Sequence, residues 1–84
     1  MEARDFEVVL ASLRQALTDR RTDKYSAICE VTRIAELIAQ YLPLTAELEQ
    51  SLVAARIHAL SGKPLRAITS IEETLANTPG EDGE

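Results

Sequence analysis

The sequence has few of the residues that cross-link a chain, interrupt helices or bind metals. Its 84 residues include one cysteine, one histidine, three glycines, three prolines and no tryptophan. Because Cys29 is alone, an intramolecular disulfide is excluded, and one cysteine with one histidine does not make a structural zinc site. We therefore expect a protein of a reducing compartment that holds no metal and no other cofactor.

Long apolar runs and an excess of basic residues are also missing. No segment approaches the roughly 18 apolar residues of a membrane span, and the N-terminus lacks the basic start and apolar stretch of a secretory signal. We expect a cytoplasmic protein that does not bind membranes. The nine Lys and Arg residues are outnumbered by fourteen Asp and Glu residues, for a net charge of -5. A nucleic-acid binder needs a basic face, so nucleic acid is not an expected partner.

Alanine and leucine, both strong helix formers, are the most frequent apolar residues, with twelve and eleven copies. Apolar residues recur at steps of three and four, which indicates an all-α protein. The expected helices run from about Asp5 to Arg20, Lys24 to Leu42, Ala46 to Ser61 and Pro64 to Asn77. Short connections favour antiparallel neighbours, so we expect two stacked helical hairpins. Residues 1–79 form one domain in this interpretation, and residues 80–84 form a disordered acidic tail.

The first two helices each have one expected core face. In the first helix it consists of Phe6, Val9, Leu10, Leu13, Ala16 and Leu17, and in the second of Ile28, Val31, Ile34, Ala35, Leu37, Ile38, Tyr41 and Leu42. Cys29 is expected on the apolar side of the second helix as a small hydrophobic residue. The fourth helix has a single stripe of Leu65, Ile68, Ile71 and Leu75.

The third helix differs because it has two apolar stripes. One consists of Leu48, Leu52, Ala55 and Ala59, and the other of Val53, Ile57 and Leu60. Together they cover a wider arc than the usual stripe of a surface helix. Either the helix is central and packs against two neighbours, or the second stripe faces a partner protein. The candidate partner-binding residues are Val53, Ile57 and Leu60, with Arg56 beside them.

The expected second hairpin resembles a tetratricopeptide repeat, a helix–turn–helix unit of about 34 residues. The residues that carry the resemblance are Ala55, Gly62, Ala67, Ile71 and Pro79. The resemblance implies that small residues let the two helices approach closely and that Gly62 lies in the turn. The chain departs from the pattern at Ser51, Ala54 and Thr74, where the family prefers Trp, Leu and Ala.

Residues 34 to 75 also resemble the small repeat-type chaperones of bacterial type III secretion, which hold needle subunits unpolymerised. The resemblance rests on Ile34-Ala35-Glu36-Leu37, on Leu52 followed ten residues later by Gly62, and on Leu65-Arg66-Ala67-Ile68. It implies a chaperone or adaptor that binds an amphipathic helix of a client in a helical groove. The partner would be a small helical protein, and a homodimer or a heterodimer is left open.

His58 gives an alternative from a different class. With Leu60 and Gly62 it resembles part of the motif of histidine phosphotransfer domains, four-helix bundles in which an exposed histidine accepts phosphate. Ser61 stands where that family has a lysine, and Pro64 interrupts the helix too early. The simpler interpretation is a half-buried histidine within a hairpin.

Enzymatic chemistry has little support in the sequence. No pair of carboxylates has the surroundings of an acid–base pair, and no glycine-rich phosphate loop is present. We therefore expect a non-enzymatic module with no catalytic residues. A self-associating helical bundle is a further alternative. Four bases around the first turn, Arg14, Arg20, Arg21 and Lys24, either dock an acidic segment or form a solvated helix end.

Overall fold

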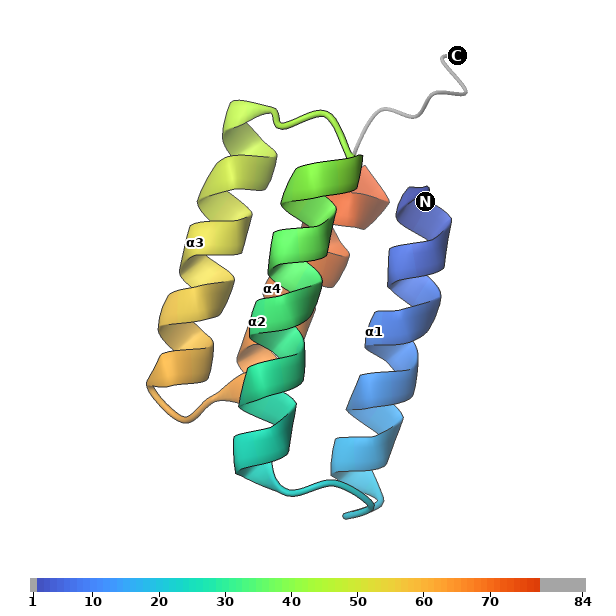
Figure 1. The fold of residues 1–84 in the computed structure, drawn as a ribbon, viewed down its shortest axis with the longest axis vertical. Coiled ribbons are helices and arrows are strands. Elements are labelled where there is room, and N and C mark those ends of the chain that lie inside the picture. The colour runs from blue at the N-terminus through green and yellow to red at the C-terminus, as the bar shows by residue number, and fades with distance from the viewer. Residues whose placement is uncertain (1, 78–84) are drawn as a thin grey trace.

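The computed structural model describes residues 2–77 and confirms the all-α prediction. The four helices are α1 (Ala3–Thr18), α2 (Lys24–Tyr41), α3 (Ala46–Leu60) and α4 (Pro64–Asn77). Each helix runs opposite to the one before it (Figure 1). The predicted acidic tail, residues 80–84, lies outside the described residues.

The two ends of α1 lie earlier in the chain than predicted. The helix begins at Ala3 instead of Asp5 because the Asp5 carboxylate turns back and accepts a hydrogen bond from the Glu2 amide at 2.9 Å. Such a reciprocal bond caps a helix N-terminus. The helix ends at Thr18 because Arg20 has a φ of 60°. The amides of Arg20 and Arg21 donate to Leu17 and Ala16, which is the Schellman termination.

The other helix boundaries follow local signals close to those predicted. The Asp23 carboxylate accepts from the Ser26 amide at 2.7 Å, and the Thr45 hydroxyl accepts from the Leu48 amide at 3.0 Å. Both are N-cap bonds, at α2 and α3. The bond from the Ser26 amide holds the pKa of Asp23 below its usual value. Gly62 lies in the turn after α3, as predicted, and its φ of 84° is the left-handed conformation that favours glycine.

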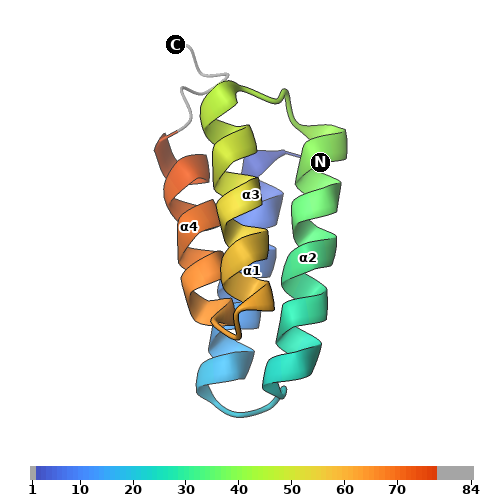
Figure 2. The same cartoon turned by 90° about the vertical axis from the view of Figure 1, so that its left-hand side faces the viewer.

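The four helices form a bundle around one core. Helix α1 packs against α2 and α4, and α3 packs against the same two helices on the other side. Helices α2 and α4 also meet across the centre, whereas α1 and α3 lie on opposite sides (Figures 1 and 2). Of these contacts between helices, the one between α3 and α4 is the most extensive. Ala55, Ala59 and Ala67 are fully buried, and such small residues allow a close approach of the helices.

The core contains residues from all four helices. They are Phe6, Leu10, Val31, Ile34, Ala35, Ile38, Leu48, Leu52, Ala55, Ala59, Ala67, Ile68, Ile71 and Leu75. Four predicted core assignments are wrong. Leu65, at the start of the predicted stripe of α4, is 43 % exposed because it lies in the first turn of the helix, at the end of the bundle. Val9 and Tyr41 are exposed because they lie at the edges of their helix faces, and Cys29 is exposed on α2. Conversely, Ala27 is fully buried although it was not among the predicted core residues.

Candidate partner-binding surface

Helix α3 has apolar side chains on two opposite faces. The inner face carries Leu48, Leu52, Ala55 and Ala59, which are all buried. At 3.6 residues per turn, Val53, Ile57 and Leu60 lie on the other side of the helix. Their exposed fractions are 53 %, 58 % and 76 %. The interpretation that both stripes belong to the core is therefore wrong, although α3 does pack against two neighbours. We call Val53, Arg56, Ile57 and Leu60 the α3 outer face.

The α3 outer face is hollowed on both sides of Val53. One hollow of about 390 Å³ runs along α3 itself, and another of about 200 Å³ lies between α2 and α3. The first is lined by Ala46, Glu49, Gln50, Val53, Ala54 and Ile57. The second is lined by Ala35, Glu36, Ala39, Leu44, Glu49, Leu52, Val53 and Arg56. Helix α3 lies foremost in Figure 2, so this side of the molecule faces the viewer there.

The structure brings most of the predicted residues together and separates one of them. Val53 lines both hollows, Ile57 lines one and Arg56 lines the other. Leu60 is the most exposed of the set but lines neither hollow, because it lies at the end of α3. The predicted surface is thus continuous from Val53 to Ile57, and Leu60 extends it toward the turn after α3.

Sequence reasoning missed two residues of this surface. Leu44 lies between α2 and α3, is half exposed and lines the hollow between these helices. Glu49 lines both hollows and places a carboxylate beside the apolar stripe. Leu44 follows Pro43 outside any helix, so helical periodicity gave no signal for it. Glu49 lies in the first turn of α3, where an acidic residue is explained by the helix dipole alone.

His58, the alternative phosphoacceptor, is half-buried near the C-terminus of α3. The helix ends two residues later at Leu60, and the backbone carbonyl of His58 accepts from the Lys63 amide at 2.8 Å. This bond belongs to the Schellman termination around Gly62. The structure therefore places His58 at a helix end, where the phosphotransfer motif would require the helix to continue.

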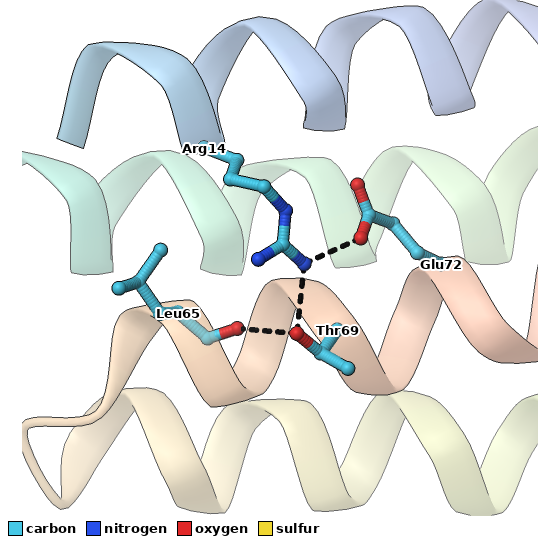
Figure 3. Close-up of polar contacts among 4 residues, drawn as sticks. All are labelled: Arg14, Leu65, Thr69 and Glu72. Atoms are coloured by element: carbon cyan, nitrogen blue, oxygen red, sulfur yellow. Dashed lines mark hydrogen bonds and ion pairs between the residues drawn. The ribbon is translucent and has the colours of Figure 1, made fainter. Parts of the chain in front are cut away.

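Polar contacts between the helices fix α4 in place. Arg14 on α1 donates from Nη2 to Thr69 Oγ1 at 2.7 Å and to Glu72 Oε1 at 2.5 Å (Figure 3). The sequence left open whether Arg14 docks an acidic segment or lies at a solvated helix end. In the structure it binds Glu72, which is 58 positions away in the sequence. On the other side of α4, the buried Ser51 donates to the Ser70 carbonyl at 2.9 Å.

The described residues hold no cluster of three or more His, Cys, Asp or Glu side chains that is arranged to bind a metal ion. Within residues 2–77, no helix has the length and the apolar character to cross a membrane. The chain has no match among protein-family models, curated proteins or solved structures.

Proposed function

We propose that this protein is a non-enzymatic interaction module that binds an amphipathic helix of another protein on the α3 outer face. The supporting observation is the position of Val53, Ile57 and Leu60. They are spaced four and three residues apart, each is more than half exposed, and they lie opposite the core face of the same helix. A row of this kind matches the apolar stripe of a partner helix.

The chemistry of the surface fits such a partner. Apolar side chains in the row are bordered by Glu36, Glu49 and Arg56, which line the hollow between α2 and α3. Aliphatic residues exposed together are typical of interaction surfaces, whereas single exposed ones are ordinary. Charged residues at the border would set the orientation of the partner helix. The hollows beside Val53 would accept side chains that project from it.

The finer form of the proposal is a small bacterial chaperone or adaptor in the cytoplasm, similar to the type III secretion chaperones that hold needle subunits. It is supported by the resemblance of residues 34 to 75 and by the close α3–α4 hairpin with its small residues Ala55 and Ala67. In this form, the client is a small helical protein whose apolar stripe would otherwise drive its own assembly.

The test compares capture of partner proteins from the host lysate by three versions of the full chain. These are the wild type, Ile57→Asp and Val8→Asp. Val8 is a matched control, since it is 61 % exposed on α1, away from the α3 outer face. We expect the wild type and Val8→Asp to recover one helical protein at near-equal amounts, and Ile57→Asp to lose it. Each variant must retain the helical circular dichroism of the wild type.

Two outcomes would contradict the proposal. If Ile57→Asp recovers as much partner as the wild type, the α3 outer face is not the binding surface. If only copies of the same chain are recovered, the protein is a self-associating bundle. Light scattering of the purified chain over a range of concentrations tests this case, because the molar mass of a self-associating bundle exceeds that of one chain.

A further inference from the structure

A third hollow lies at the end of the bundle where α1 and α2 are joined. This hairpin extends beyond the turn between α3 and α4, so the end of the molecule is stepped (Figures 1 and 2). At the step lies a hollow of about 690 Å³, which is within the usual size range of ligand sites. It is lined by Leu17, Lys24, Gly62, Lys63, Pro64, Leu65, Arg66 and Thr69. We call this set the basic ledge.

The basic ledge combines an apolar floor with unneutralised positive charge. Leu17, Pro64 and Leu65 are apolar, and among the described residues no carboxylate lines the hollow. Within residues 2–77 the ion pairs are Arg14 with Glu72, Arg21 with Asp19 and Arg33 with Glu30. Lys24, Lys63 and Arg66 have no such partner in that part of the chain.

The two acids nearest in sequence to this end are already engaged. Asp19 accepts from Gln15 Nε2 at 2.9 Å and lies 3.8 Å from Arg21 Nε. Asp23 caps α2 through the Ser26 amide. Neither is among the residues that line the hollow. The protein thus has a net charge of -5 but presents a cluster of cations at one end.

The walls of the basic ledge are held in position by backbone and side-chain bonds. The turn that carries Gly62 and Lys63 is closed by two hydrogen bonds to the end of α3. Thr69 donates to the Leu65 carbonyl at 3.0 Å and accepts from Arg14, as Figure 3 shows. A surface that is already ordered loses little conformational entropy when a ligand binds.

We propose that the basic ledge binds a short acidic segment of a partner protein. One large apolar side chain of that segment would rest on Leu17, Pro64 and Leu65, and carboxylates on either side of it would pair with Lys24, Lys63 and Arg66. Complementary charge of this kind favours the right partner and speeds association. The apolar floor separates this ligand from nucleic acid, which needs a longer basic stripe for its phosphates.

This site is separate from the α3 outer face, since the two share no lining residue. It therefore goes beyond the proposed function and can fail independently of it. Both surfaces together would let the module hold a client at two points, one through apolar contacts and one through charge. Linked contacts of this kind raise affinity without new interactions at either point.

The test is a titration of the full chain, labelled with nitrogen-15, with a synthetic peptide that has one central leucine flanked by glutamates. The matched control peptide has glutamine at every glutamate position. We expect the acidic peptide to shift the backbone amides of Lys24, Lys63, Leu65 and Arg66, with an affinity that falls as salt is added. The glutamine peptide should leave these amides unshifted.

Three variants complete the experiment. The double variant Lys63→Glu with Arg66→Glu should weaken binding of the acidic peptide by about tenfold or more. The double variant Arg4→Glu with Arg33→Glu, which makes the same charge change outside the ledge, should bind like the wild type. Ile57→Asp should also bind like the wild type, so a failure of the α3 outer face does not affect the result.

Three results would overturn the proposal. They are equal binding of the glutamine peptide, shifts confined to the α3 outer face, and unchanged affinity in the folded double variant. Circular dichroism establishes the fold of each variant. If the double variant does not fold, the single variants Lys24→Glu and Lys63→Glu are compared with Arg33→Glu by the same titration.

Discussion

Arg14 on α1 and Glu72 on α4 are 58 positions apart in the sequence, and their side chains are joined by a hydrogen bond and ion pair of 2.5 Å. The same Nη2 atom of Arg14 also reaches Thr69 one helical turn earlier. Both ionised side chains are partly exposed, with exposed fractions of 37 % and 28 %. This pair links the first helix to the last and closes the bundle (Figure 3).

Removing this link should loosen α1 by a small amount. Arg14→Met keeps most of the apolar stem, so it isolates the polar contact. We expect it to lower the free energy of unfolding by about 1 kcal/mol, since partly exposed ion pairs contribute little more. A double-mutant cycle with Glu72→Gln should give a coupling energy of about 0.5–1 kcal/mol. A coupling energy of zero in urea denaturation would show that the pair does not stabilise the fold.

The left-handed residue Arg20 is a site where a substitution should stabilise the protein. A side chain at this φ of 60° costs about 1–2 kcal/mol relative to glycine, which in turn loses more entropy on folding. We expect Arg20→Gly to raise the free energy of unfolding by about 0.5–1 kcal/mol. Thermal denaturation would measure the effect as an increase in Tm.

Gly62 provides the reverse experiment at the equivalent position after α3. A Cβ atom there would lie 3.4 Å from Lys24 Nζ, which is an ordinary contact, so the cost comes from the φ of 84°. Gly62→Ala should therefore lower the free energy of unfolding by about 1 kcal/mol. If Arg20→Gly also lowers the free energy of unfolding, the left-handed φ of Arg20 does not cost the protein stability.

Two isoleucines on different faces should respond differently to the same change. Ile71 on α4 is fully buried, and Ile71→Ala should cost about 2–5 kcal/mol because it leaves a cavity. Ile57 is 58 % exposed, and Ile57→Ala should change the free energy of unfolding by less than about 0.5 kcal/mol. Urea denaturation measures both. A large loss of unfolding free energy in Ile57→Ala would mean that this side chain stabilises the fold and is not available to bind a partner.

Asp23, at the N-terminus of α2, should contribute to the free energy of unfolding in a way that depends on pH. Its pKa is held below the usual value by the bond from the Ser26 amide, so the folded state favours the ionised form. This contribution is fully present above the pKa of the unfolded chain and is lost as the pH falls through the lower, folded pKa. Asp23→Asn also caps a helix but does not titrate.

The measurement compares the unfolding free energies of the wild type and Asp23→Asn over the acid range. We expect the wild type to lose stability relative to Asp23→Asn as the pH falls below the usual pKa of an aspartate. The substitution leaves every other carboxylate in place, so the difference between the two proteins isolates Asp23. A difference that stays constant with pH would mean that the cap does not depend on ionisation.

For His58 we expect no acid-labile phosphate when the chain is incubated with a phosphorylated receiver domain. The side chain is half-buried, α3 ends at Leu60, and Ser61 replaces the lysine of the phosphotransfer motif. His58→Gln should also capture the same partner as the wild type. Phosphate that is bound to wild type and absent from His58→Gln would instead establish the phosphorelay function.

Local signals in the sequence were sufficient for the helices. Thr45 caps α3, Gly62 ends it, and Pro64 begins α4, so these boundaries matched the prediction within one residue. Each of these signals acts over about one helical turn and needs no distant partner. The ends of α1 were predicted wrongly for two reasons. At the start, the Asp5 carboxylate accepts from the Glu2 amide and so extends the helix toward the N-terminus. At the end, Arg20 takes the left-handed conformation although it is not a glycine.

The tertiary arrangement decided which surfaces remain free. Both apolar stripes of α3 have good helical spacing, and only the packing of α2 and α4 against the Leu52 side leaves Val53 and Ile57 in solvent. The basic ledge exists because Leu17 and Lys24 of the first hairpin lie beside Lys63 and Arg66 of the second. Periodicity is a property of a few neighbouring residues, whereas burial and charge neutralisation depend on segments far apart in the chain.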